Sequence, residues 1–160
     1  MADNKVSHSN KIVKKVWIQA SAEVVYQALT ESKDLEHWFC DNASCDPREG
    51  GELIAHWYNG KSRQKGRALI NQLIPRRLLE LLWVDDGCGV QQQESKHALR
   101  YEIHSKSEMT ELIMTDKDGS PSDEETYAFL DQGWNSVLLE LKDYCENKER
   151  NNRKSGENYS

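Results

Sequence analysis

The chain has 160 residues, 30% of them charged, with a formal net charge of -6 and a pI near 5.4. This acidic balance argues against nucleic acid or an anionic membrane surface as the main partner, because both reward clustered lysine and arginine. There is no apolar run of about 18 residues and no apolar stretch typical of a secretory signal, so we expect a cytoplasmic protein without a membrane span.

The first predicted elements are one strand and two short helices. Lys11–Gln19 is rich in β-branched residues and predicts a strand, after a polar segment, residues 1–10, that we expect to be disordered. Ser21 is a good helix cap for Ala22–Leu29, and Ser32 is the predicted cap of a second helix that ends at Phe39. Four apolar side chains of the first helix should face inward: Val24, Val25, Ala28 and Leu29.

Five more strands follow, separated by sequences typical of turns. Their predicted ranges are Glu52–Tyr58, Ser62–Leu73, Arg77–Val84, His97–His104 and Met109–Thr115. Asn59-Gly60 is a strong hairpin signal between the first two of them. Gly66 lies inside a predicted strand and indicates a bulge or a close approach of another group to the backbone. Residues 85–96 read as a polar loop.

One long helix is the last predicted element. Ser122 and Glu125 have the spacing of a capping box that would start it. Its apolar residues recur every three or four positions: Tyr127, Leu130, Trp134, Val137, Leu138, Leu141 and Cys145. This spacing predicts a helix of about 25 residues with one apolar stripe. Residues 148–160 are charged and polar and should form a flexible tail, so we expect a single domain over 11–147.

The element order predicts an α+β domain in which a mainly antiparallel sheet of about six strands curls around the long helix. Several motifs resemble those of a known family: A-S-A-E-V-V-Y-Q-A-L-T at 20–30, L-E-H-W-F at 35–39, D-P-R-E-G-G at 46–51 and G-W-N-S-V-L-L-E-L-K-D-Y at 133–144. Together they resemble the helix-grip fold of the START/Bet v-like (SRPBCC) superfamily. Within it, the chain is similar to the family of the activator of the heat-shock-protein-90 ATPase.

This resemblance implies several functions, because the superfamily contains proteins of different activities. Its co-chaperone members imply a chaperone partner and a role in the stress response. Other members bind hydrophobic ligands, which implies a lipid or an aromatic metabolite held between sheet and helix. More distant relatives are polyketide cyclases or aromatases, which implies an enzyme.

The predicted ligand site is an aromatic lining inside the fold. Four of the five tryptophans fall on elements that should face the interior, and an apolar ligand needs such a lining with a few polar groups to orient it. The predicted lining is Trp38, Trp57, Trp83, Tyr101, Trp134 and Leu138. The alternative is that these side chains simply fill an ordinary core.

Four polar side chains could orient a ligand. Strand alternation places Tyr101 inward with its apolar neighbours and His104 on the opposite face. His56 is adjacent to Trp57 in the same predicted strand, so its side chain should point to the opposite face of the sheet. The direction of Arg67 stays open, because it comes directly after Gly66.

No nucleophilic triad, P-loop or dinucleotide-binding glycine pattern is present, so we predict no catalytic residue and no cofactor. His37, Cys40 and Cys45 offer only three ligands at spacings that match no zinc template, so we predict no metal site. Cys88 is a weaker candidate for a reactive thiol. An enzyme of cyclase type would depend on Tyr101 or a histidine as its acid or base.

We therefore expect a soluble binding module for a hydrophobic small molecule rather than an enzyme. A chaperone-associated interaction domain is the first alternative and a cyclase is the second. The partners predicted are a hydrophobic small molecule or a chaperone and no nucleic acid, with the chain as a monomer or homodimer.

Overall fold

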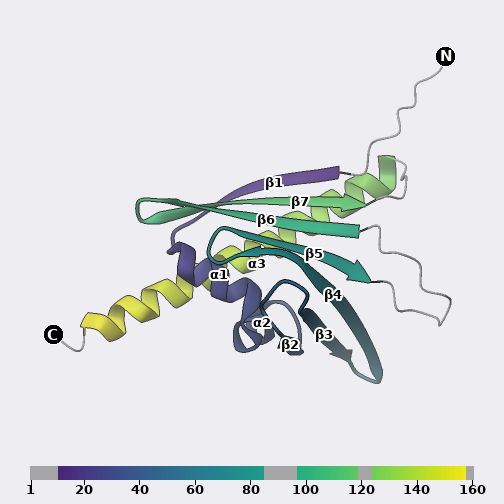
Figure 1. The fold of residues 1–160 in the computed structure, drawn as a ribbon, viewed down its shortest axis with the longest axis horizontal. Helices are drawn as coiled ribbons and strands as arrows, with labels where there is room; N and C mark the ends of the chain where they lie inside the picture. Colours follow the sequence, from purple (N-terminus) through teal and green to yellow (C-terminus); the bar gives the residue numbers. More distant parts are fainter. Residues whose placement is uncertain (1–10, 85–96, 119–123, 158–160) are drawn as a thin grey trace, which may run out of the picture.

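The computed structural model describes residues 11–84, 97–118 and 124–157 (Figure 1). In chain order its elements are β1 Lys11–Ile18, α1 Ala22–Thr30, α2 Ser32–Trp38, β2 Asn42–Cys45, β3 Glu52–Asn59, β4 Ser62–Ile74, β5 Leu78–Val84, β6 His97–Lys106, β7 Met109–Asp118 and α3 Glu124–Glu157. The strands form one antiparallel sheet in the order β1-β7-β6-β5-β4-β3-β2. The prediction of an α+β fold with a curved antiparallel sheet is confirmed.

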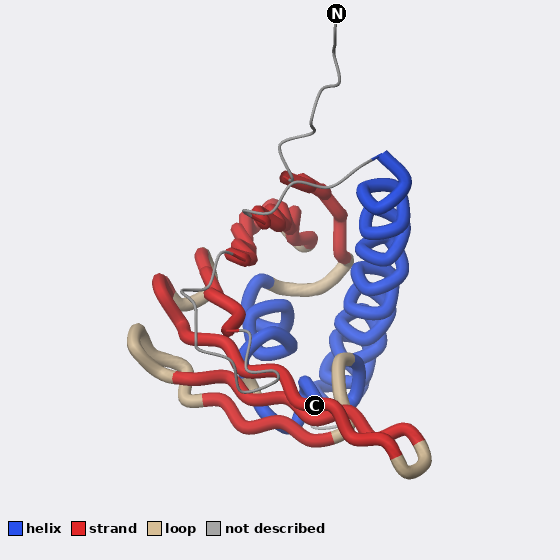
Figure 2. The backbone as a smooth tube through the Cα atoms, turned by 90° about the vertical axis from the view of Figure 1, so that its right-hand side faces the viewer, coloured by secondary structure: helices blue, strands red, loops and turns tan. Residues whose placement is uncertain are grey.

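The sheet curves around the short helices, and α3 closes the open side of the curve (Figure 2). Helix α3 lies beside β1 and against α1 and α2. The concave face carries the core, because alternate side chains of each strand point into it. On β6 the buried residues are Leu99, Tyr101 and Ile103, as their alternation predicts. On β7 they are Thr110, Leu112, Met114 and Asp116.

Helix α1 begins where its cap predicts. The Ser21 side chain accepts a hydrogen bond from the Val24 backbone N–H at 3.2 Å, which satisfies one of the free donors of the first turn. The four apolar residues predicted to face inward are buried. Helix α2 corrects a prediction, because its cap is Glu31 and Ser32 is already helical. The Glu31 backbone is extended, and its side chain makes no capping hydrogen bond. The predicted cap, Ser32, is therefore one residue beyond the observed cap.

The sheet has seven strands rather than about six, because Asn42–Cys45 forms the additional strand β2. It pairs with β3 from Asn42↔His56 to Cys45↔Leu53. The four residues, N-A-S-C, are small or polar and show no β-branched alternation. Pairing with β3 therefore makes this a strand, and local propensity does not.

The predicted β3–β4 hairpin is confirmed, but its turn is Gly60-Lys61, one residue later than Asn59-Gly60, because Asn59 still pairs with Ser62. Gly60, the first residue of this turn, has a positive φ of 62° that favours glycine. The expected irregularity in β4 does exist, but it lies between Ile70 and Gln72 in the pairing with β5. A bulge at Gly66 is therefore not found. The alternative reading of that glycine, a close approach, is confirmed by two neighbouring indoles.

Helix α3 has 34 residues and continues to Glu157, well past Lys148. At 1.5 Å per residue it is about 50 Å long. The prediction that the helix ends before Lys148 is wrong, since charged residues there contact the first two helices. The cap proposed at Ser122 lies outside the described residues, and so do the loop at 85–96 and Cys88.

Strand β1 is an edge of the sheet, and two lysines in it are paired with acids. Lys14 lies among inward-facing positions and its Nζ contacts Asp131 Oδ1 of α3 at 2.7 Å. Lys15 faces outward and contacts Glu111 Oε2 of β7 at 3.4 Å. A charged side chain on the inner face of an edge strand discourages pairing with another chain. Within the described ranges, no helix is both long and apolar enough to cross a membrane.

Candidate functional site

Four aromatic side chains gather at one end of the concave face, and we call them the aromatic cluster: Trp38, Phe39, Trp57 and Trp83. Phe39, at the end of α2, is their common neighbour. Its ring centroid lies 5.3 Å from that of Trp38, 5.3 Å from that of Trp57 and 6.5 Å from that of Trp83. These are ordinary distances for favourable tilted and edge-on aromatic pairs. All four are only partly buried.

The polar atoms of two of these indoles are already bonded to backbone. Trp38 Nε1 donates to the Ala28 carbonyl at 2.8 Å, and Trp57 Nε1 donates to the Phe39 carbonyl at 2.8 Å. A buried indole needs such a partner. The bonds hold the two rings in place, so what the rings offer to a molecule inside the fold is apolar surface.

Gly66 of β4 lies beneath two indoles of the aromatic cluster. A Cβ atom at this position would be 3.0 Å from Cζ3 of Trp83 and 3.2 Å from Cζ3 of Trp57. Since real Cβ atoms rarely come so close, only glycine lets both rings lie against the backbone of β4 in this arrangement.

A second, polar group joins the same face to α3, and we call it the polar group: Tyr101 of β6, Asp116 of β7 and Trp134 of α3. Asp116 is 6% exposed, and its Oδ2 accepts a hydrogen bond from Trp134 Nε1 at 2.7 Å. Burial raises the pKa of the Tyr101 hydroxyl, and the nearby charge of Asp116 raises this pKa further. Tyr101 is therefore a neutral hydrogen-bonding group at neutral pH and a weak acid. This does not favour it as a catalytic acid or base.

The structure distributes the six predicted lining residues over these two groups. Trp38, Trp57 and Trp83 belong to the aromatic cluster, while Tyr101 and Trp134 belong to the polar group. Leu138 is buried one turn after Trp134 on α3, where it packs into the core.

The other polar candidates lie on the convex face. Arg67 Nε contacts Glu52 Oε2 at 3.1 Å, so the open question of its direction is answered. His104 is exposed, and its Nε2 is 3.7 Å from Glu102 Oε1. The ring of His56 stacks on that of Tyr58. None of these three residues faces the concave site.

Two members of the site, Phe39 and Asp116, are absent from the predicted lining, and Gly66 is predicted only to allow a close approach. Nothing in the local sequence shows which rings Gly66 accommodates. Asp116 lies just beyond the predicted strand, which ends at Thr115. The observed β7 continues to Asp118, and extending the alternation of Leu112 and Met114 by two residues would have placed Asp116 inside.

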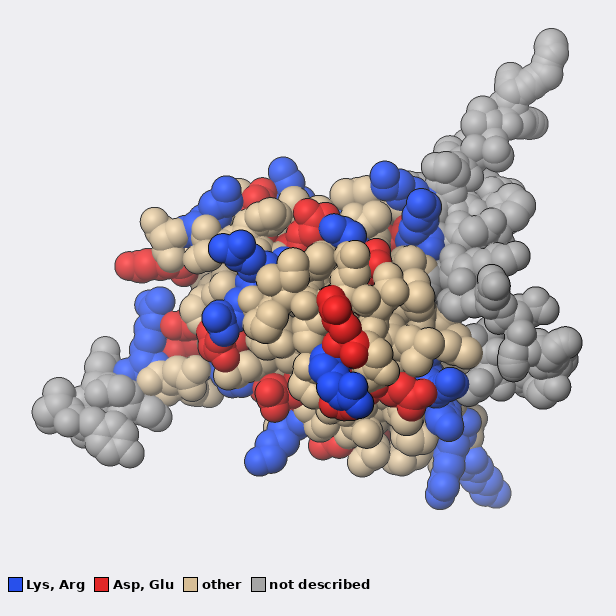
Figure 3. Space-filling view, in the orientation of Figure 1, with Lys and Arg blue, Asp and Glu red and all other residues tan. Residues whose placement is uncertain are grey.

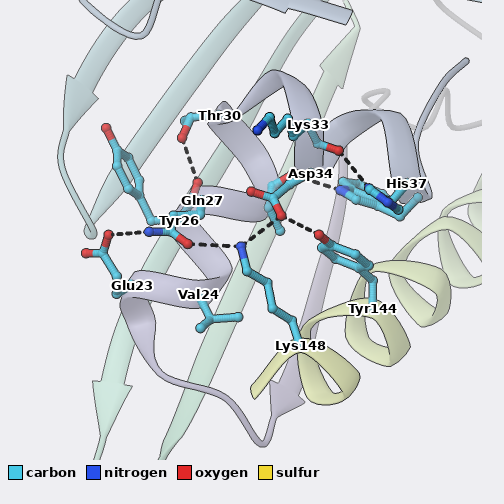
Figure 4. Close-up of polar contacts among 12 residues, drawn as sticks. Glu23, Val24, Tyr26, Gln27, Thr30, Lys33, Asp34, His37, Tyr144 and Lys148 are labelled. Atoms are coloured by element: carbon cyan, nitrogen blue, oxygen red, sulfur yellow. Dashed lines mark hydrogen bonds and ion pairs between the residues drawn. The ribbon is translucent and has the colours of Figure 1, made fainter. Parts of the chain in front are cut away.

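A partly buried ionic cluster fastens α3 to the two short helices (Figure 4). Asp34 of α2 is 7% exposed and accepts hydrogen bonds from the Tyr144 hydroxyl and from Lys148 Nζ, the latter at 2.8 Å. Lys148 Nζ also donates to Gln27 Oε1 of α1 at 3.0 Å. The His37 ring stacks on Tyr144 with 5.9 Å between the centroids. The lysine predicted to begin a flexible tail is therefore a principal anchor of the helix.

The described cysteines are poorly suited to act as nucleophiles. Burial raises the pKa of Cys45 to about 11 and that of Cys145 to about 12. Burial also raises the pKa of Cys40. These groups are therefore thiols at neutral pH, whereas nucleophilic attack and metal binding need a thiolate.

Comparison with known proteins supports the family resemblance. The sequence model of the family described as "Activator of Hsp90 ATPase homolog 1-like protein" matches residues 19–146. No curated protein matches the chain.

Solved structures with the same fold include the Aha1 dimer from Colwellia psychrerythraea, at 20% identity and a TM-score of 0.68 over 85% of this chain and 96% of that chain. The AHSA1-like protein from Aeromonas hydrophila has 18% identity and a TM-score of 0.70 over 86% of this chain and 93% of that one. DynU16, a putative protein in the dynemicin biosynthetic locus, has 19% identity and a TM-score of 0.71 over 88% of this chain and 48% of that one.

Proposed function

Because this chain belongs to the family of Activator of Hsp90 ATPase homolog 1-like proteins, we propose that it is a binding module that holds an apolar small molecule between the concave face of the sheet and α3. The observation that carries the proposal is the aromatic cluster. Its side chains face the interior of the domain and yet remain partly exposed, whereas the aliphatic residues around them are buried. Exposed aromatic surface that converges on a concave face is typical of ligand sites.

The aromatic cluster would supply affinity by removing apolar surface of the ligand from water. Each square ångström of apolar surface buried contributes about 25 cal/mol. Trp38 and Trp57 keep their N–H bonds to the backbone in this arrangement, so a ligand would not have to replace them. Their rings are held in place before binding, which reduces the entropy lost on association.

The polar group would orient the ligand. A buried carboxylate disfavours a second negative charge nearby, because the two charges repel each other where little water screens them. Asp116 therefore favours a ligand whose polar end donates a hydrogen bond, such as an alcohol or an ammonium group. It disfavours a fatty carboxylate.

The proposal is tested by titration with N-phenyl-1-naphthylamine, a neutral aromatic probe whose fluorescence rises in apolar sites. We expect saturable binding of one probe per chain, weakened several-fold by Trp83→Leu. Trp17→Leu is the matched control, because Trp17 is 44% exposed on the convex face. Native mass spectrometry of the protein purified from its host should show an excess mass that leaves on denaturation. The proposal is contradicted if the native mass equals that of the protein alone and the probe fluorescence does not saturate.

Other hypotheses stay predictions: a chaperone partner, a role in the stress response, cyclase chemistry, a cytoplasmic location and assembly into a homodimer. The homodimer hypothesis is supported by the similar Aha1 protein from Colwellia psychrerythraea, whose solved structure is a dimer. The matching test is sedimentation equilibrium of this chain over a hundredfold range of concentration.

A further inference from the structure

The β3–β4 hairpin carries a concentration of positive charge on a protein whose net charge is -6. Lys61 lies in its turn, and Arg63 and Lys65 follow at alternate positions of β4. All three are exposed. Figure 3 shows blue lysine and arginine atoms gathered toward the lower right, where Figure 1 places the tip of this hairpin.

An aromatic side chain of β3 supports one of these cations on the convex face. Tyr58 pairs with Arg63, and His56 pairs with Lys65. The Arg63 guanidinium lies 5.5 Å from the centre of the Tyr58 ring, and the His56 and Tyr58 rings stack with 6.3 Å between centroids. A cation above an aromatic ring is partly restrained, so it loses less freedom when it meets an anion.

Two acidic groups beside this face, Asp41 and Glu52, have other partners. Asp41 Oδ2 accepts a hydrogen bond from the Tyr58 backbone N–H at 2.7 Å. Glu52 contacts Arg67, the next cation along β4. Within the described part of the chain, no carboxylate forms an ion pair with Lys61, Arg63 or Lys65. Their charge is therefore available to a partner.

We propose that the convex face of this hairpin, formed by Tyr58, Lys61, Arg63 and Lys65, is a docking surface for an extended acidic segment of a partner protein. Side chains two residues apart on a strand are separated by about 7 Å. An extended peptide with glutamate or aspartate at alternate positions has the same spacing and would bring one carboxylate to each of the two cations on the strand, Arg63 and Lys65.

A nucleic acid fits this surface less well. Single-stranded nucleic acids gain affinity by stacking bases on exposed aromatic faces. The Tyr58 ring already has a guanidinium over it, and the acidic remainder of the protein would repel a long polyanion. This inference is independent of the interior ligand site, which lies on the concave face.

The test uses a fluorescein-labelled peptide of alternating glutamate and serine, followed by fluorescence anisotropy at 50 mM and 200 mM salt. We expect saturable binding that weakens several-fold at the higher salt, because the pairs are solvent-exposed. The double variant Arg63→Glu with Lys65→Glu should weaken binding by at least about tenfold, since two attractions become repulsions. The control is Lys106→Glu with Lys154→Glu, which changes the net charge equally at exposed sites on β6 and α3.

Three results overturn the inference. One is the absence of saturable peptide binding at 50 mM salt. Another is an equal loss in the two double variants, which would show that only overall charge matters. The third is tighter binding of a labelled oligouridine than of the peptide, which would assign the face to nucleic acid. Thermal unfolding of each variant confirms that it is folded, and both pairs of substitutions are at exposed positions.

Discussion

The indole of Trp134 and the buried carboxylate of Asp116 are joined by a hydrogen bond of 2.7 Å between α3 and β7. This bond ties the first half of the long helix to the sheet. The second half is tied to α2 by the bonds of Tyr144 and Lys148 to Asp34. Both of these contacts of α3 are centred on a buried acid, and each can be removed without the other.

Trp134→Phe should lower the free energy of unfolding by about 1–3 kcal/mol, because it keeps an aromatic ring but leaves a buried carboxylate without this donor. Urea denaturation measures the change. Trp17→Phe is the control and should alter stability by less than about 0.5 kcal/mol, since Trp17 is exposed on β1. Equal effects of the two substitutions would show that the bond to Asp116 is not stabilising.

Gly66→Ala should destabilise the protein by about 1–3 kcal/mol, because the added methyl group would press on the rings of Trp57 and Trp83. The tryptophan emission should also shift as these rings move. Gly133→Ala provides the contrast, because a Cβ on this exposed glycine of α3 meets nothing within 4 Å. That change should stabilise the protein by about 0.5–1 kcal/mol. If both substitutions stabilise, the packing on Gly66 is looser than described.

Lys148→Met should cost about 2 kcal/mol of stability, because it removes the cation from buried Asp34. Removing one partner of a fully buried ion pair costs more stability than this. The cost is smaller here because the Lys148 side chain is 24% exposed, so water screens part of its charge. Lys154→Met, at an exposed site on the same helix, should change little. Hydrogen exchange provides a second measurement: the Lys148 variant should exchange faster in the last turns of α3. Unchanged exchange there argues against an anchoring role.

Acidification should remove the stabilising contribution of Glu149. Its carboxylate accepts a hydrogen bond from the Ser21 backbone N–H, which lowers its pKa below the usual value of about 4.3. A lowered pKa in the folded state stabilises the protein above the unfolded pKa, and this stabilisation disappears as the pH falls through the folded pKa. The difference in unfolding free energy between wild type and Glu149→Gln should therefore be constant above about pH 5 and shrink below about pH 4. A constant difference down to pH 3 contradicts this assignment.

Asp116→Asn should change which ligands the interior accepts. In competition with N-phenyl-1-naphthylamine, 1-dodecanol should displace the probe from wild type at a concentration at least about tenfold lower than dodecanoate does, because the acid would meet a buried carboxylate. In the Asp116→Asn variant, the difference between the displacing concentrations of dodecanoate and 1-dodecanol should be smaller, because dodecanoate should bind more tightly than it does to wild type. Equal displacement of the probe by both compounds from wild type removes Asp116 from ligand selection and leaves the apolar site itself intact.

Most of the fold could be predicted from the sequence, because the strands and helices have clear periods of two and about 3.6 residues. The inward direction of Tyr101 followed from its alternation with Leu99 and Ile103. Local patterns could not show β2, which depends on pairing with β3. They also missed the contact between Asp34 and Lys148, which are 114 positions apart. At the site, the tryptophans were visible as candidates, whereas Phe39 and Asp116 gained their places only through tertiary packing.

The pairing of β1 with β7 also has a consequence for how the chain folds as it is synthesised. Lys11 pairs with Lys117, so the first strand can join the sheet only after nearly three quarters of the chain exists. The hydrogen bond from the backbone N–H of Gln19 can form only later, because its acceptor Glu146 is 127 residues further along the chain. Contacts so distant in sequence slow folding, because a long loop must close before they form. Until β7 and α3 emerge from the ribosome, β1 has no strand to pair with and only the short helices lie against the concave face, and this is the interval in which the nascent chain is most prone to aggregation.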